Sequence, residues 1–121
     1  MNKLEEFFNF IKKSKYIVSF TGAGISTESG IPQFRGKNGL WDKYSPEIYG
    51  TLPGLISQFL ILPSKVSQFI YDFINPILTA EPNISHFTLS ELEKKEYLKS
   101  IITQNIDNLH QASGNKNVIE L

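Results

Sequence analysis

The chain has 121 residues, of which 40% are hydrophobic and 20% are charged, a composition typical of a folded domain and not of a disordered protein. Its twelve Lys and Arg balance its twelve Asp and Glu, so we expect neither nucleic acid nor a membrane as a direct partner. The sequence contains no cysteine, which excludes disulfides, thiol catalysis and thiolate-bound zinc within these residues.

An amphipathic helix is predicted over residues 3–13. Its hydrophobic side chains recur with helical spacing and are Leu4, Phe7, Phe8 and Ile11. Asn2 and, three residues later, Glu5 are typical of a capping box, and we expect this helix to lie on a sheet. Polar residues interrupt the segment, so it lacks the core of a signal peptide, and no run approaches the ~18 apolar residues of a membrane span. The cytoplasm is the expected location.

A short β-favouring run from Tyr16 to Phe20 leads into a glycine-rich turn, Gly22-Ala23-Gly24-Ile25-Ser26. A helix is expected to begin near Gly24. Glycine lets the backbone approach a pyrophosphate, and the N–H groups of a helix N-terminus attract anions. These glycines could also form only a tight turn, because the third glycine, Gly30, comes too late for the G-x-G-x-x-G dinucleotide pattern.

Residues 30–53 show no clear period, which predicts a long loop of a kind that is usually functional. Within it, Arg35 could pair with a phosphate in a bidentate manner, and Phe34 is an apolar plate beside it. A solvated Arg and a core Phe are the alternative interpretation.

Helical spacing returns over residues 63–78, where Pro76 is expected to kink or end the helix. Pro82 and Asn83 then open another helix. Further along, strands are predicted over 98–103 and 117–121, with a short helix over 108–112. This order predicts a parallel sheet, the N-terminal half of a doubly wound, Rossmann-like α/β domain. A last strand without a following helix is expected to leave one sheet face partly uncovered.

Polar side chains follow the second predicted strand, namely Gln104, Asn105 and Asp107. Ligands of such sheets bind at the carboxyl ends of the strands, and two amides with a carboxylate suit sugar hydroxyls and a carboxamide. Asn105 or Asp107 could instead cap the next helix. His86 and His110 are interpreted as structural residues that cap or pack.

Four motifs, in this order and at these separations, resemble the sirtuin family of NAD-dependent protein-lysine deacylases. They are Gly22-Ala23-Gly24-Ile25-Ser26, Gly30-Ile31-Pro32-x-Phe34-Arg35-Gly36, Pro82-Asn83-x-x-His86 and Thr103-Gln104-Asn105-Ile106-Asp107-x-Leu109-His110. The resemblance covers nearly the whole chain. It implies the N-terminal part of a sirtuin-type domain, with a helical small-domain insertion at about 45–80, NAD as cofactor and an acyl-lysine protein as substrate.

The residues that the resemblance implies in cofactor binding are Gly22, Ala23, Gly24, Ser26, Thr27, Phe34, Arg35, Trp41, Gln104, Asn105, Ile106 and Asp107. The glycine turn and Arg35 would contact the phosphates, and Phe34 would shield the reacting ribose from water. The two amides after the second strand would hold the nicotinamide ribose, while Ile106 and Asp107 would bind the carboxamide. The loop over 30–41 would close over NAD.

The sequence departs from the family pattern at several points. Gln33 stands where many members have Asp, a variation that other members share. Ile70 and Phe73 replace the Tyr and Arg of members that remove acidic acyl groups, which implies an apolar acyl channel, although core packing is the alternative. The family's general-base His comes after the strand that ends at Leu121, so no catalytic residue is assigned within this chain. Because general-base loss costs roughly 10²- to 10⁴-fold in rate, we expect the chain alone to be inactive or nearly so. The family's zinc module is also expected only after that strand.

The resemblance implies removal of acyl groups, acetyl first among them, from protein lysine, with release of nicotinamide and O-acyl-ADP-ribose. NAD hydrolysis by water is an alternative, because the same ribose and carboxamide contacts serve glycosidic cleavage. A protein that binds NAD or ADP-ribose without catalysis is a third hypothesis.

Overall fold

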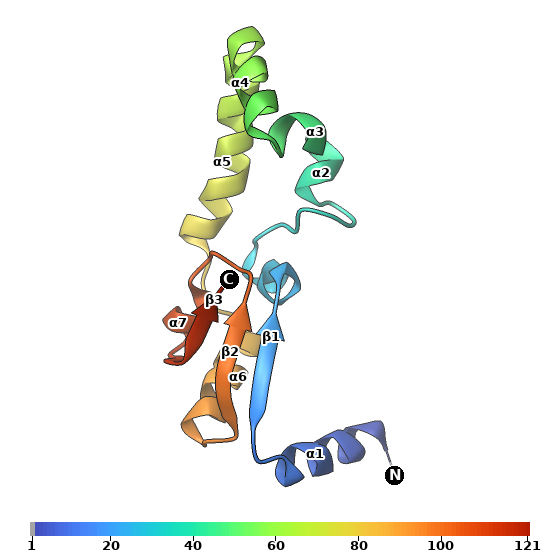
Figure 1. Cartoon of the computed structure of the whole chain (residues 1–121), viewed down its shortest axis with the longest axis vertical. Coiled ribbons are helices and arrows are strands. Elements are labelled where there is room, and N and C mark those ends of the chain that lie inside the picture. The colour runs from blue at the N-terminus through green and yellow to red at the C-terminus, as the bar shows by residue number, and fades with distance from the viewer. Residues whose placement is uncertain (1) are drawn as a thin grey trace. The chain divides into compact units, whose positions relative to one another are not determined.

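The computed structural model describes residues 2–121, which form two compact units (Figure 1). The residues up to Ile25 and those from Glu81 to Leu121 make up one unit, which we call the sheet unit. Residues Ser26–Ala80 make up the other, which we call the helical unit. Among the described residues, no helix combines the length and the apolar character that crossing a bilayer requires.

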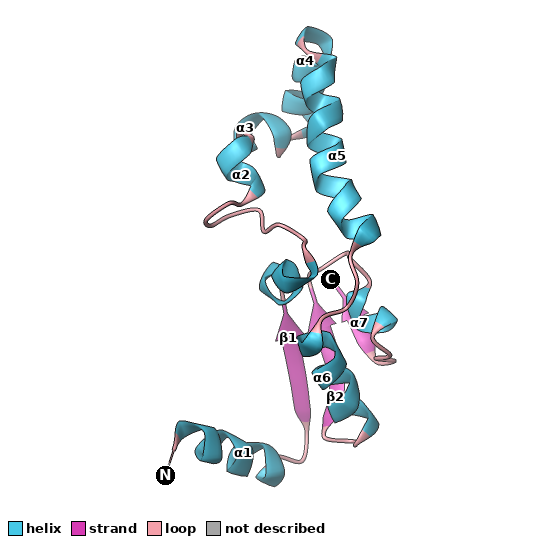
Figure 2. Cartoon of the chain, turned by 180° about the vertical axis from the view of Figure 1, so that it is seen from behind, coloured by secondary structure: helices cyan, strands magenta, loops and turns pink. Residues whose placement is uncertain are grey.

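The sheet unit contains three parallel strands in the order β1 (Ile17–Thr21), β2 (Leu98–Thr103) and β3 (Val118–Glu120). Their positions agree with the predicted strands, and the predicted parallel sheet is confirmed. The helices α6 (Ile84–Lys94) and α7 (Leu109–Ala112) lie on one side of this sheet (Figure 2). They cover the central strand, whose Ile101 is fully buried. The helix predicted to open at Asn83 is also confirmed, since the Asn83 side chain accepts a hydrogen bond from the Ser85 N–H at 2.9 Å.

The N-terminal helix α1 spans Lys3–Lys13, as its spacing predicted. The capping box is present, because Asn2 Oδ1 accepts from the Leu4 N–H and Glu5 Oε2 accepts from the Asn2 N–H. The expectation that α1 lies on a sheet is wrong for this structure, in which none of its residues is buried. The amphipathic pattern determines which face of the helix is apolar, but it does not determine what covers that face.

The segment η1 (Ala23–Ser29) follows β1 and is a 3₁₀ helix, the tighter helical form in which side chains at i and i+3 eclipse. Its first hydrogen bond joins the Ile25 N–H to the Gly22 carbonyl oxygen at 3.2 Å. The helix predicted near Gly24 is therefore present, although it begins one residue earlier and is not α-helical.

The helical unit contains α2 (Leu40–Lys43), α3 (Pro46–Tyr49), α4 (Leu52–Ile61) and α5 (Pro63–Thr79). The predicted loop over 30–53 is thus wrong for its second half, where α2 and α3 lie. The periodicity also missed α4, which lies in the helical insertion that the resemblance implied, because Ser57 and Gln58 are its only polar side chains and leave little contrast between its sides. Pro76 lies inside α5, which ends at Thr79 and not at the proline.

The core of the helical unit is mainly aromatic. Its buried hydrophobic residues are Leu40, Tyr44, Tyr49, Val66 and Phe69. Phe69 lies at the centre, with its ring centroid 5.0 Å from those of both Tyr44 and Tyr49. These ring contacts hold short helices together that would be marginal in isolation.

Candidate functional site

The glycine turn after β1 meets the residues that follow β2. The Asn105 side-chain amide donates a hydrogen bond to the Gly22 carbonyl oxygen at 2.9 Å. One residue earlier, the Gln104 N–H donates to the Thr21 carbonyl oxygen at 3.2 Å. The carboxyl ends of the two neighbouring strands are therefore linked directly, at the sheet edge where ligands of parallel α/β folds bind.

Only glycine at position 22 leaves room for the Gln104 side chain in its observed position. A Cβ atom added to Gly22 would stand 2.5 Å from Gln104 Nε2, well inside van der Waals contact. Glycine therefore leaves space that the Gln104 amide occupies, while its carbonyl oxygen holds Asn105. The structure brings together these two predicted motifs, which are more than eighty residues apart in the sequence.

The residues after Asn105 have two different environments. Ile106 is 69% exposed, so its apolar side chain is available to a ligand. Asp107 Oδ1 accepts a hydrogen bond from the Leu109 N–H at 3.0 Å, which holds the turn just before α7, whose N-cap position is Asn108. The residue between, Asn108, adopts a left-handed conformation with φ 61°, which turns the chain into that helix.

Two buried histidines pack behind the strand ends. His110 Nε2 lies 2.9 Å from Thr21 Oγ1, and the His110 ring centroid is 5.1 Å from that of His86. His86 Nδ1 accepts from the Asn83 N–H at 3.2 Å, so this residue completes the capping box of α6. The structural interpretation of both histidines is confirmed.

Burial determines the charge of this histidine pair. It lowers the pKa of His86, although the negative charge of Asp107 acts in the opposite direction. Burial also lowers the pKa of His110, as does the neighbouring His86, again opposed by Asp107. Both imidazoles are therefore neutral at pH 7, which suits a buried pair whose rings lie against each other.

Asn83 is a site residue whose role sequence analysis missed. Its side-chain amide donates to the Ile25 carbonyl oxygen at 2.8 Å and so holds η1 against the start of α6. The sequence showed that Asn83 belongs to a family motif. Only the folded structure shows that its side-chain oxygen caps α6 while its side-chain nitrogen holds η1. Ser26, in contrast, is only 1% exposed, so its hydroxyl is enclosed and not presented at the surface. Thr27 is exposed.

Three of the predicted residues of the helical unit come together in one aromatic cluster. The ring centroid of Phe34 is 5.3 Å from that of Trp41 and 5.5 Å from that of Phe73. The Trp41 N–H also donates to the Phe34 carbonyl oxygen at 2.9 Å, which closes the loop before α2. Arg35, the residue after Phe34, is exposed. Ile70 lies outside the cluster, because it lines a separate shallow groove along α5 with Ile74 and Leu78.

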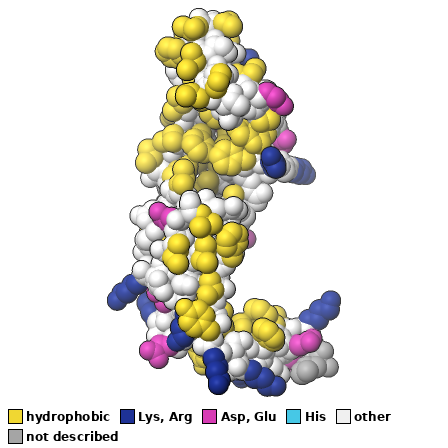
Figure 3. Space-filling view, in the orientation of Figure 1, with side chains coloured by type: hydrophobic (Ala, Val, Ile, Leu, Met, Phe, Trp, Pro, Cys, Tyr) yellow, Lys and Arg dark blue, Asp and Glu magenta, His cyan; other side chains and the backbone are white. Residues whose placement is uncertain are grey.

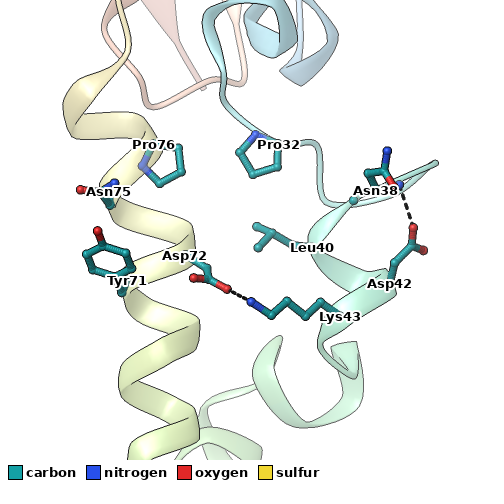
Figure 4. Close-up of a pocket in the computed structure, with 10 residues that line it drawn as sticks. Pro32, Asn38, Leu40, Asp42, Lys43, Tyr71, Asp72, Asn75 and Pro76 are labelled. Carbon is teal, nitrogen blue, oxygen red and sulfur yellow. Dashed lines mark hydrogen bonds and ion pairs between the residues drawn. The ribbon is translucent and has the colours of Figure 1, made fainter.

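A cavity of about 580 Å³ lies between the loop before α2 and the end of α5 (Figure 4). At its rim, Lys43 Nζ donates to Asp72 Oδ2, and the Tyr44 hydroxyl donates to the same oxygen at 2.6 Å. Gln68 Nε2 donates to the other carboxylate oxygen at 2.7 Å. Hydrogen bonds from Lys43, then Tyr44 and Gln68, lower the pKa of Asp72 to about 2. This carboxylate therefore joins the end of α2 to α5.

The described residues contain no group of three or more His, Asp or Glu side chains that could hold a metal ion. The zinc module that the family resemblance implies comes after Leu121 in the family pattern, and it stays a prediction.

Comparison with known proteins decides the family. The sequence model of the Sir2 family matches residues 22–121. The chain belongs to the Sir2, or sirtuin, family. Curated sirtuin relatives include the NAD-dependent protein deacetylase of Thermotoga maritima, which is 45% identical over 98% of this chain and 46% of its own length. The NAD-dependent protein deacylase of Pyrococcus furiosus is 49% identical over 98% of this chain and 46% of its own length. The chain thus spans about half the length of these relatives.

Solved sirtuin structures support the same assignment. A Sir2 structure with a deacetylated p53 peptide and 3′-O-acetyl-ADP-ribose is 45% identical, with a TM-score of 0.80 over 98% of this chain and 46% of that chain. A mutant Sir2 homologue in complex with ADP-ribose is 42% identical, with a TM-score of 0.82 over all of this chain and 46% of that one. These likenesses confirm the predicted Rossmann-like α/β fold.

The predicted cofactor residues of this sirtuin chain fall into two groups. The first combines the glycine turn with the segment after β2 and is connected by the hydrogen bonds of the sheet unit. The second combines Phe34 and Trp41 with Phe73, at the edge of the core of the helical unit. Each group is ordered by contacts within its own unit.

Proposed function

We propose that this chain supplies the nicotinamide-ribose side of the NAD site in an NAD-dependent protein-lysine deacylase. The names of its relatives and the acetyl-ADP-ribose and peptide ligands of its solved neighbours support this proposal. The proposed substrate is a protein with an acylated lysine, and acetyl is the acyl group that we propose first. A cytoplasmic location is part of the same proposal.

The observation that carries the proposal is the contact between the glycine turn and the end of β2. A nucleotide needs a backbone that it can approach closely, and the missing Cβ of Gly22 supplies such a cradle. The amides of Gln104 and Asn105 border the same cradle, and amides suit ribose hydroxyls. The residues present therefore fit NAD.

In the proposed reaction, NAD accepts the acyl group as nicotinamide leaves. Gln104 and Asn105 orient the ribose, and the contact of Asn105 with Gly22 holds this amide in place beforehand. Ile106 would offer an apolar surface to the nicotinamide, whose carboxamide it would help to bind. The family resemblance implies that Phe34, which is 41% exposed at the edge of its aromatic cluster, would exclude water from the reacting ribose carbon. Water would then not compete with the acyl oxygen for that carbon.

We further propose that the 121-residue chain alone does not turn over. It spans about half the length of its relatives, so it supplies only part of the contacts that the whole site requires. Weak binding of NAD without deacylation is the expected behaviour of the chain by itself.

NAD binding by the chain tests the cradle directly. Gln104→Ala removes an exposed amide without touching the core, and we expect it to weaken NAD binding about tenfold or more, measured by ligand-observed NMR. Gln111→Ala is the matched control, because it removes the same group from α7 in the same unit. Equal loss in both variants, or in neither, would contradict the cradle.

A chimera tests the reaction. In it, this chain replaces the matched half of the Thermotoga maritima deacetylase, so that the complete length is restored. We expect nicotinamide release that depends on an acetyl-lysine peptide. Release without the peptide would support NAD hydrolysis instead, and saturable ADP-ribose binding without any release would support a non-catalytic protein.

A further inference from the structure

The start of the short helix α2 is bonded to the segment that contains Phe34. The Leu40 N–H donates to the Gln33 carbonyl oxygen at 2.9 Å. The Trp41 N–H donates to the Phe34 carbonyl oxygen, also at 2.9 Å. The two backbones lie close together, because a Cβ atom on Gly39 would stand only 2.8 Å from the Phe34 carbonyl oxygen. A displacement of α2 therefore moves the backbone of Phe34 with it.

The other end of α2 is held by Asp72 of α5. Asp72 Oδ2 accepts from Lys43 Nζ and from the Tyr44 hydroxyl, the latter at 2.6 Å. Gln68 Nε2 donates to Asp72 Oδ1 at 2.7 Å and so orients the carboxylate from within α5. Figure 4 shows the Lys43 side chain reaching from α2 to Asp72. One carboxylate thus ties the end of α2 to α5.

The Phe34 ring contacts both of these helices. Its centroid is 5.3 Å from that of Trp41 on α2 and 5.5 Å from that of Phe73 on α5. Phe73 follows Asp72 directly, so the same turn of α5 touches the Phe34 ring and holds α2. Four residues are too few for a helix to keep its place without such contacts. The position of α2, and with it that of Phe34, therefore depends on Asp72.

The Phe34 ring is also accessible to a ligand. It is 41% exposed, and Figure 3 shows hydrophobic side chains gathered on the surface of the helical unit. Ring contacts are not directional in the way that hydrogen bonds are, so they permit the ring to move when α2 moves.

We propose that Asp72 is a positioning residue for Phe34, because by holding α2 against α5 it keeps this ring where it shields the ribose from water. The proposal rests on the proposed function, in which Phe34 has that shielding role. Without Asp72, a water oxygen bonds to the ribose carbon, and the carbon–nitrogen bond to nicotinamide breaks. The electron pair of that bond passes to nicotinamide, and the proton of the water goes to solvent. Loss of Asp72 thus diverts NAD from acyl transfer to hydrolysis.

A purely stabilising role for Asp72 is the alternative. In that case its removal would lower the stability of the helical unit without loosening Phe34 in molecules that stay folded. Trp41 separates the two roles, because it is the only tryptophan of the chain and its ring contacts that of Phe34. The fluorescence of Trp41 therefore reports on the packing between α2 and Phe34.

Acrylamide quenching of Trp41 fluorescence in the 121-residue chain tests the positioning role without any ligand. We expect Asp72→Ala to raise the quenching constant at least about twofold, while circular dichroism stays that of the folded chain. Asp72→Glu restores a carboxylate and should return the constant toward its original value. Glu91→Ala is the matched control, because it removes a carboxylate that is bonded to Lys94 Nζ at 2.8 Å on α6, and it should change nothing.

A milder variant keeps this test decisive if Asp72→Ala does not fold. Tyr44→Phe removes only the hydroxyl that donates to Asp72 and leaves the ring in the core. It should raise the quenching constant in the same direction as Asp72→Ala.

The chimera with the Thermotoga maritima deacetylase measures the consequence for the reaction. We expect Asp72→Ala to raise the share of nicotinamide that is released without an acetyl-lysine peptide at least about threefold. Phe34→Ala should raise that share too. Adding Asp72→Ala to Phe34→Ala should raise it no further, because a residue that acts through Phe34 has no effect once this ring is absent.

Four results would overturn the proposal. They are unchanged Trp41 quenching in folded Asp72→Ala, no recovery in Asp72→Glu, an equal rise in Glu91→Ala, and additive effects of the Asp72 and Phe34 substitutions. An inactive chimera would contradict only the proposed function, because the quenching experiment decides the positioning role without NAD. An active chimera in which Asp72→Ala leaves the share of peptide-independent release unchanged would contradict only the positioning role.

Discussion

The two units of this chain are stabilised by different kinds of contact. In the sheet unit, strand ends are joined by hydrogen bonds between main chain and side chains, with neutral histidines packed behind them. In the helical unit, short helices surround a cluster of stacked aromatic rings. The proposed cofactor contacts thus depend on hydrogen bonds in the sheet unit and on the packing of aromatic rings in the helical unit. A substitution should therefore act differently according to the unit in which it lies.

The largest effect is expected for Phe69→Ala, which empties the centre of the aromatic core. Loss of this ring should lower the free energy of unfolding by roughly 3–5 kcal/mol, because the surrounding rings cannot collapse into the space. Urea denaturation measures the loss, and hydrogen exchange should locate it in α5 more than in β2. Tyr71→Ala, on the exposed side of the same helix, is the control and should cost less than about 0.5 kcal/mol. Uniform loss of protection in both units would show that they do not respond separately.

A smaller effect is expected for Gly39→Ala, compared with Gly22→Ala. A Cβ on Gly39 would stand 2.8 Å from the Phe34 carbonyl oxygen, so the backbone around the aromatic cluster must move, at roughly 1–3 kcal/mol. A Cβ on Gly22 meets only the end of the Gln104 side chain, which can swing away, so stability should change by less than about 0.5 kcal/mol. NAD binding should show the reverse order. Thermal unfolding and ligand-observed NMR measure the two quantities, and equal destabilisation by both variants would contradict the distinction.

The smallest effect is expected from mild acid, and it should separate the units by pH. The pKa values of His86 and His110 are lowered in the folded state, so their contribution is complete above the ordinary pKa of 6.5 and is lost as pH falls below it. The pKa of Asp72 is also lowered, from 3.8 to about 2, so its contribution persists until pH falls below about 4. Hydrogen exchange between pH 7 and 5, corrected for intrinsic rates, should show β1 and α7 weakening while α5 does not. Parallel weakening of both units would refute this assignment.

Much of the sheet unit was predictable from local patterns. The helix over 3–13 and the strand over 98–103 were predicted at their observed limits, because spacing, caps and β-branched residues act over a few neighbours. The helical unit was less predictable. Its α4 has only two polar side chains, Ser57 and Gln58, and α2 and α3 each last for about one turn, so none of them carries the strong periodicity on which such predictions depend.

The site divides in the same way. The motifs identified the glycine turn and the residues after β2, but they did not show that Ser26 is enclosed. Nor did they reveal that Asn83 anchors the turn. Each of these facts depends on which of several nearby backbone groups a polar side chain bonds in the folded state, and local sequence does not decide between them.

By itself, the sequence determined the three strands of the sheet unit with its helices α1 and α6, the parallel order of the sheet and the family motifs. The tertiary structure decided that Gln104 fills the space beside Gly22, that Phe73 joins Phe34 while Ile70 does not, and that α1 keeps its apolar side uncovered. The physical reason is one of range. Helix and strand formation depend on residues a few positions apart, whereas packing depends on side chains that meet only after the chain has folded.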